Sequence, residues 1–219
     1  MADDRELATV ELLGALTYAQ LRAFEATARA VRVAPDARAA DAVASFAVRE
    51  FEAYRGLHDC LTGLTDLVDA VVSRQRARID EYFDGVPTGV DWLSACTFFA
   101  AGLPLAGDFV SEIAPFLDEP TREVVLGALT RRGSFVEYAT AQVVARVGED
   151  PATRDHARHL VADITGKALT QFQAAITDTD ALEVLLGEDP DDRRVREVAM
   201  RVLDAHRRRM HALGFEDPE

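Results

Sequence analysis

A single glutamate, Glu50, lies in the middle of an apolar stripe where a core-facing helix is expected to carry hydrophobic side chains. Between residues 38 and 65, large apolar residues recur at the helical spacing i, i+3, i+4 and i+7: Val43, Phe46, Ala47, Phe51, Tyr54, Leu57, Leu61 and Leu64. With successive residues about 100° apart, Glu50 falls within about 20° of the centre of this stripe. An interior carboxylate must be paired, protonated or bound to a metal. In an all-helical protein it first suggests a carboxylate metal site between bundle helices.

Turn-forming residues next to N-cap candidates divide the chain into six helical segments. The breaks fall at 33–36, 84–89, 118–121, 148–151 and 187–192. The segments run roughly over 4–32, 37–83, 90–117, 120–147, 152–186 and 191–213, with Gly63 and Gly166 as possible interruptions. No segment sustains the period-2 alternation of a strand. We therefore expect one all-α domain over residues 1–219, with an up-and-down four-helix bundle over about 4–147 and two additional C-terminal helices over about 152–213.

The charge balance argues against nucleic acid as a general partner of this chain. Its net charge is −14, so the average surface repels phosphate. Residues 193–211 differ, because this segment contains seven arginines but only two acidic residues, Glu197 and Asp204, which leaves an excess of five positive charges. Three of these arginines recur every seven residues on one side of the expected helix: Arg194, Arg201 and Arg208. This basic helix indicates a solvated or salt-bridged face, or else a dock for RNA or an acidic partner.

The sequence contains no uninterrupted run of about 18 apolar residues, the length that spans a membrane, and its acidic N-terminus lacks a signal-peptide pattern. We therefore expect a cytoplasmic protein without a membrane partner. The two cysteines, Cys60 and Cys96, lie on predicted apolar helix faces without metal-ligand spacing, which indicates buried free thiols.

Two other polar side chains are expected to point into the same bundle as Glu50. Gln20 lies at the edge of the apolar stripe of 4–32, and Arg132 lies within the stripe of 120–147. When 37–83 folds back on 4–32 across a turn near residue 35, Gln20 becomes level with Glu50. We expect Glu50 to be buried and hydrogen-bonded to Gln20, Arg132 or both.

The remaining ligands of a two-metal site are missing from the expected positions. A di-iron bundle needs carboxylates from two helices and a Glu-x-x-His from each of two others. Glu50 is followed three residues later by Ala53, and His58 is about one turn too far along. The pair His156 and His159 would need a third ligand, and an exposed pair near a helix start is the simpler interpretation.

Several stretches together resemble a known family. They are ELLGALTYAQLRAF (11–24), AVREFEAYRGLHDCL (47–61), GDFVSEIAPFLDEPTREVVLGAL (107–129), GKALTQFQ (166–173) and AHRRRMHALGF (205–215). In order and spacing they are similar to a ferritin-like family of actinobacterial type, related to the tRNA hydroxylases that act on methylthio-isopentenyl-adenosine (MiaE-like). The resemblance implies an ancestral non-haem di-iron oxygenase.

The resemblance also implies where ligands would lie in this chain. It places a Glu at the position of Gln20, a His at Ala53, an Asp near Leu103 and a His near Phe135, and it retains Glu50. None of the four substituted positions carries a ligand of the implied type here. The set of Gln20, Glu50, Ala53, Leu103, Arg132 and Phe135 is therefore interpreted as a vestigial site.

The leading hypothesis is a ferritin-like protein with a degraded di-iron site that needs no cofactor, is non-catalytic or a binding protein, and forms a homodimer. The alternative is a non-haem di-iron or single-metal oxygenase or hydroxylase, using iron on a modified tRNA base or small molecule. A third hypothesis is an RNA-binding adaptor that uses Arg194, Arg201 and Arg208. The sequence contains no phosphate loop, nucleophile elbow or zinc-helix motif, and no catalytic residue can be named from it.

Overall fold

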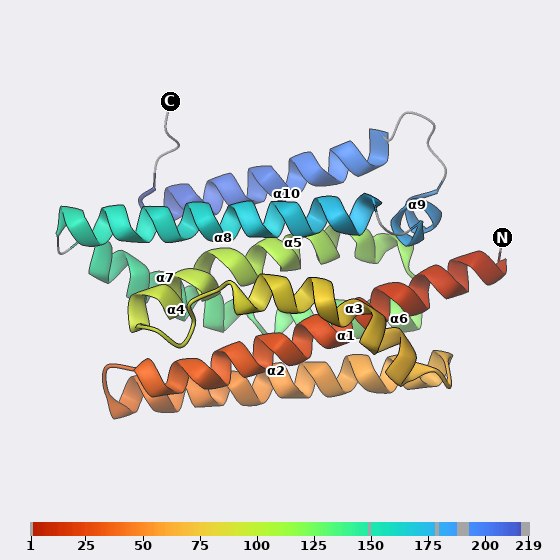
Figure 1. Ribbon diagram of the computed structural model, residues 1–219, viewed down its shortest axis with the longest axis horizontal. Helices are drawn as coiled ribbons and strands as arrows, with labels where there is room; N and C mark the ends of the chain where they lie inside the picture. Colours follow the sequence, from red (N-terminus) through yellow and green to blue (C-terminus); the bar gives the residue numbers. More distant parts are fainter. Residues whose placement is uncertain (1, 149, 178–179, 188–192, 216–219) are drawn as a thin grey trace.

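The computed structural model describes residues 2–148, 150–177, 180–187 and 193–215, and all regular secondary structure in these residues is helical. Figure 1 shows long helices that run roughly along one axis. The helices are α1 (Ala2–Ala30), α2 (Ala37–Leu64), α3 (Val68–Asp84), α4 (Trp92–Thr97), α5 (Leu103–Ile113), α6 (Glu119–Thr130), α7 (Gly133–Val147), α8 (Pro151–Thr177), α9 (Ala181–Leu186) and α10 (Arg193–Ala212). A π-helical turn, Phe98–Gly102, joins α4 to α5, and 3₁₀ turns follow α1 at Val31–Val33 and α5 at Ala114–Phe116.

Aspartates cap the start of three of these helices, and two of them, Asp36 and Asp150, lie in predicted breaks. The carboxylate of Asp36 accepts from the backbone N–H of Ala39 at 2.8 Å, and that of Asp91 accepts from Ser94 at 2.9 Å. The carboxylate of Asp150 likewise accepts from the backbone N–H of Thr153 at 2.8 Å. Each cap satisfies a backbone N–H that has no partner within the helix, which stabilises the helix start.

Three of the six predicted segments are divided in the structure. The segment 37–83 breaks at 65–67, where Thr65 is extended and its hydroxyl accepts from the backbone N–H of Leu67 at 3.1 Å. That side-chain bond competes with helix continuation. The segment 120–147 breaks between α6 and α7, and 152–186 is divided into α8 and α9. Gly63 lies in the last turn of α2, whereas Gly166 does not interrupt α8.

The four predicted bundle segments share one apolar core. Ala23 of α1, Val43 of α2, Phe98 of the π turn and Phe135 of α7 belong to the same cluster of buried side chains. Helix α3 is an additional helix that packs along α1. The two long C-terminal helices are α8, which packs on the π turn and α7, and α10, which packs on α5. The short α9 contacts the N-terminal helix α1.

The π turn lies at the centre of this core, and all five of its residues are buried. Two residues after it comes Pro104, whose ring clashes with the carbonyl of residue 100 in a regular α-helix, and the wider turn relieves that clash. Helix α8 approaches closely at Gly102, where an added Cβ would lie 2.7 Å from Cδ2 of Phe98 and 2.8 Å from Cγ2 of Ile164.

The segment Trp92–Phe116 is long and apolar enough, by length and composition alone, to cross a membrane. In the structure 61% of its most apolar stretch is buried inside the protein. A central core helix has this composition for the same reason that a membrane helix does, because it is surrounded by apolar groups.

Candidate functional site

Glu50 is buried in the bundle, with 3% of its surface exposed, and is hydrogen-bonded to the neighbouring helix α1. The side-chain amide of Gln20 donates to the backbone carbonyl of Glu50 at 3.0 Å, and also to its Oε2. Gln20 is itself 4% exposed. The α1–α2 hairpin thus places the two residues level with each other, as the sequence predicted.

Arg132 provides the cation that balances this carboxylate. Its Nε donates to Oε1 and Oε2 of Glu50 at 3.1 and 3.0 Å, and its Nη2 donates to Oε2 at 3.0 Å. The same Nη2 donates to Oε1 of Gln20 at 2.6 Å, which closes a ring of three side chains. We refer to Gln20, Glu50 and Arg132 as the triad. In it, both carboxylate oxygens accept charge-assisted hydrogen bonds.

The break between α6 and α7 gives Arg132 its position. Arg132 is the residue that immediately precedes α7, and its side chain is 14% exposed. An arginine in the middle of a core-facing helix would have its whole side chain buried. At the junction between two helices, Arg132 can extend its guanidinium into the interior while the rest of its side chain stays closer to the surface.

The other three predicted ligand positions are apolar and buried. Ala53, one turn beyond Glu50, is 3% exposed, Leu103 is 3% exposed and Phe135 is 2% exposed. The ring of Phe135 stacks on Phe46 at 4.4 Å between centroids and lies 4.6 Å from Phe99. Leu103 and Phe135 belong to the same core cluster, whereas Ala53 belongs to a neighbouring one.

These residues do not fit a two-metal centre. Such a centre needs several oxygen ligands and imidazoles that converge on two cations, and the triad supplies one carboxylate whose oxygens already bond a guanidinium. Within residues 2–148, 150–177, 180–187 and 193–215, no group of three or more His, Cys, Asp or Glu side chains could hold a metal ion.

An apolar cavity of about 190 Å³, which the sequence did not reveal, lies beside the triad. Arg132 and Leu103 line it, together with side chains of α1, α3, α5, α8 and α9. One available signal was the row of small residues Ala15, Ala19 and Ala23 on the inner face of α1. The other was the repeat of Gln75, Arg78, Ile79, Tyr82 and Phe83 along one face of α3, which the prediction of an unbroken helix over 37–83 obscured.

The basic helix α10 is largely bonded to its neighbours. Arg201 Nε donates to Glu112 of α5 at 2.5 Å, and Arg209 forms an ion pair with Asp108, which also lies in α5. Arg194 donates to the backbone carbonyl of Leu186, while Arg208 is exposed. This arrangement favours the salt-bridged interpretation of the basic face, and binding of RNA there stays a prediction.

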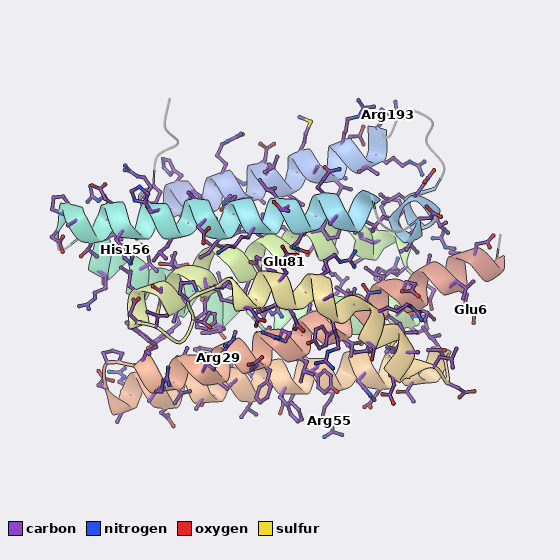
Figure 2. All side chains as sticks on the ribbon, in the orientation of Figure 1. Glu6, Arg29, Arg55, Glu81, His156 and Arg193 are labelled. Carbon is purple, nitrogen blue, oxygen red and sulfur yellow. The ribbon has the colours of Figure 1, made fainter. Side chains whose placement is uncertain are left out.

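The His-x-x-His pair lies at the surface near the start of α8. His156 and His159 are both exposed, and Figure 2 shows His156 toward the α7–α8 end of the molecule. His159 Nδ1 lies 2.7 Å from the backbone carbonyl oxygen of Asp155 in the preceding turn. His159 therefore uses Nδ1 in a contact within its own helix, and the two histidines have no third metal ligand near them among the described residues.

The two cysteines differ in accessibility, which gives a first testable prediction. Burial raises the pKa of Cys96 to about 12, whereas Cys60 is half-buried and its pKa is also raised by burial. Because the thiolate is the reactive form, we expect Cys96 to resist a thiol reagent at pH 8 until the protein unfolds, and Cys60 to react slowly in the native state. Titration with and without denaturant, with Cys60→Ser as the control, measures this. Rapid native modification of Cys96 would contradict the packing around it.

Comparison with known proteins gives one family match. The family model described as "Ferritin-like domain, actinomycetes" matches residues 3–189, which cover both the triad and the cavity wall. No curated protein matches the sequence.

Proposed function

The chain belongs to the actinomycete family of ferritin-like domains, and on that premise we propose that it is a non-catalytic binding protein in which the triad replaces a di-iron centre. The relation to the tRNA hydroxylases is part of the same proposal. It is supported by the order and spacing of the similar stretches in residues 11–24, 47–61 and 107–129.

The observation that carries the proposal is the set of bonds to Glu50. Arg132 donates to both carboxylate oxygens, at 3.0 and 3.1 Å, and Gln20 donates to one of them. These donors satisfy the carboxylate as a metal would, and they neutralise its charge in the interior.

Arg132 also opposes metal binding directly. A divalent ion at Glu50 would lie within a few ångströms of the guanidinium, where repulsion between like charges is strong in a poorly solvated interior. It would also have to displace the hydrogen bonds from Arg132 and Gln20. The neighbouring positions Ala53, Leu103 and Phe135 offer no replacement ligand.

Metal analysis tests this proposal. We expect protein expressed in iron-supplemented medium and purified without chelator to contain well under one iron per chain, measured by elemental mass spectrometry. A di-iron bundle protein carried through the same purification is the control for metal loss. Two irons per chain with oxo-bridged absorption would reject the proposal and favour the alternative, a di-iron oxygenase or hydroxylase.

The homodimer and the cytoplasmic location expected from the sequence stay predictions. Exposed apolar side chains on α2, Val48 at 58% and Phe51 at 40% exposed, lie on one outer region of the α1–α2 hairpin and would suit contact with a second copy.

A further inference from the structure

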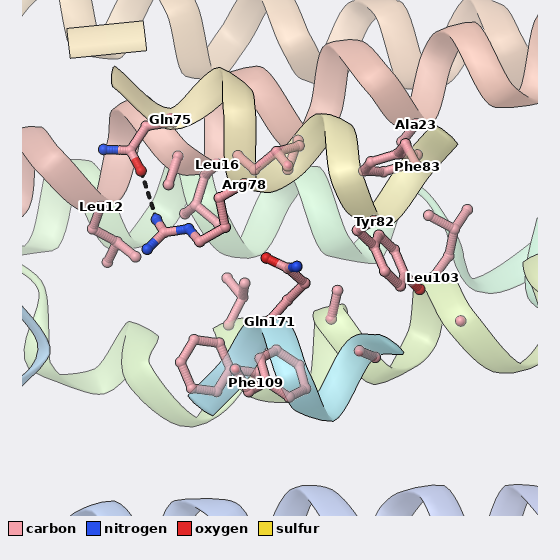
Figure 3. A pocket seen from close by; sticks show the side chains of 18 of the residues that line it. Leu12, Leu16, Ala23, Gln75, Arg78, Tyr82, Phe83, Leu103, Phe109 and Gln171 are labelled. Atoms are coloured by element: carbon pink, nitrogen blue, oxygen red, sulfur yellow. Dashed lines mark hydrogen bonds between the residues drawn. The ribbon is translucent and has the colours of Figure 1, made fainter. Parts of the chain in front are cut away.

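The cavity beside the triad has the size and lining of a small-molecule site. Its volume of about 190 Å³ is somewhat larger than the roughly 150 Å³ that accommodates benzene in an engineered protein cavity. Small side chains of α1 form one wall, and aromatic and aliphatic side chains of α3, α5 and α8 form the others. Figure 3 shows it extending from Leu12 and Gln75 at one end to Phe83 and Leu103 at the other.

Two residues that line the cavity each carry a buried polar atom with no hydrogen-bond partner among the described residues. These atoms are the hydroxyl of Tyr82 and Oε1 of Gln171. In Figure 3 Tyr82 lies toward the end of the cavity marked by Phe83 and Leu103, and the amide of Gln171 lies near its middle. Buried polar atoms are normally paired, so two unpaired ones on residues that line the same cavity point to a ligand that supplies the partner.

The character of these two atoms limits the ligand chemistry. Burial raises the pKa of Tyr82 above its ordinary value, so its hydroxyl stays protonated and can donate as well as accept. Gln171 Oε1 accepts. A ligand group that both donates and accepts, such as a hydroxyl or a primary amide, can satisfy either of them.

The charged residues on the cavity wall are bonded to other side chains. Arg132 bonds Glu50 and Gln20, and Arg78 donates to Oε1 of Gln75 at 2.6 Å. Glu11 forms an ion pair with Arg74 and accepts from Gln75 at 2.9 Å. A charged ligand would have to compete for these groups and lose its hydration in an apolar cavity. The net charge of −14 further disfavours anions.

We propose that this cavity binds a small, uncharged and mainly apolar molecule that carries one hydroxyl or amide group, with Tyr82 and Gln171 as its polar contacts. This inference rests on the proposed function, because it names a ligand class for a bundle that works without a metal.

Three probes of similar shape test the ligand class by calorimetry: benzyl alcohol, toluene and benzoate. We expect benzyl alcohol to bind with a Kd of about 0.1 to 1 mM, which is reasonable for a ligand of so few atoms. Toluene should bind several-fold more weakly because it leaves the polar atoms unpaired. Benzoate should bind at least tenfold more weakly than benzyl alcohol. Tighter binding of benzoate would overturn the proposal in favour of an anion site.

Variants assign the binding to this cavity. In a Tyr82→Phe and Gln171→Leu double variant, we expect the preference for benzyl alcohol over toluene to disappear while toluene still binds. Ala106→Phe, which directs a ring into the cavity, should abolish binding of both, and Ala145→Phe on the exposed face of α7 is the matched control. An unchanged preference in the folded double variant would overturn the assignment of Tyr82 and Gln171.

The two proposals fail in distinguishable ways when iron is measured on the same samples. Folded, iron-free protein that does not bind benzyl alcohol at 10 mM, roughly ten times the weakest Kd expected for that probe, would reject the ligand proposal and leave the metal-independent function intact. Two irons per chain would reject the metal-independent function whatever the probes do.

Discussion

Replacing Arg132 with methionine is expected to lower the free energy of unfolding by about 3 to 5 kcal/mol, because it leaves the Glu50 carboxylate uncompensated in the interior. Glu50 is 4% exposed and Arg132 14% exposed as side chains, so little water reaches the pair to take over the lost bonds. Denaturation in urea, followed by circular dichroism, measures the loss. Arg55→Met, an exposed arginine on α2, is the control and should change stability by less than about 0.5 kcal/mol.

A second substitution separates the effect of charge from the effect of packing. Glu50→Gln in the Arg132→Met background removes the stranded charge and keeps the side-chain size, so we expect it to restore most of the lost stability. Glu50→Gln alone should fold with near-normal stability because its amide oxygen can still accept from Arg132. Glu50→Leu, by contrast, should cost about 1 to 3 kcal/mol by stranding the donors. If Arg132→Met lost less than about 1 kcal/mol, the triad would not be what neutralises Glu50.

Replacing Phe135 with alanine is expected to cost about 3 to 5 kcal/mol through lost burial and the void left behind. The ring is 2% exposed and packs between Phe46 and Phe99, so several aromatic contacts are lost at once. Thermal or urea unfolding measures the change. Phe135→Leu, which fills more of the space, should cost less than Phe135→Ala.

A control on the same helix keeps the Phe135 result interpretable. Val144→Ala shortens a side chain that is 43% exposed, so it should change stability by no more than about 0.5 kcal/mol. Equal losses in Phe135→Ala and Val144→Ala would mean that the aromatic cluster does not contribute the expected packing energy. Because Phe135 lies three residues after Arg132, the effects of Phe135→Ala and Arg132→Met need not add.

Helical periodicity predicted much of the interior of the bundle, because burial of one face governs which residues a long helix presents to its neighbours. It was wrong for Phe51 and Leu64 at the flanks of the predicted stripe, which are 40% and 36% exposed. It identified Glu50, Gln20 and Arg132 as inward-facing, and the short turn after α1 made Gln20 and Glu50 level. The predicted breaks at 33–36 and 148–151 likewise marked true helix starts, where Asp36 and Asp150 cap the helices, since capping is a local interaction.

The features that the sequence did not predict depend on tertiary geometry. The break at 65–67 was missed because the apolar pattern continues through it, whereas the helix ends at an extended Thr65 whose side chain bonds Leu67. The cavity was missed because it forms between helices, where Ala15 and Ala19 of α1 face Tyr82 of α3 and Gln171 of α8. Small residues on an apolar stripe normally indicate close helix packing, and the stripe alone cannot tell a close contact from a void.

The π turn at Phe98–Gly102 has a consequence for how the length of this chain can vary. Deleting one residue from a regular α-helix rotates everything after it by about 100°, which would expose side chains such as Leu105 and Ile113. A π turn holds one residue more than the α-helical turn that would replace it. Deletion of Ala100 or Ala101 would therefore let α4 and α5 keep their orientation, but a regular helix there would restore the clash of the Pro104 ring with the carbonyl four residues before it. A one-residue deletion in this buried turn is thus expected to keep the core intact when Pro104 is replaced as well.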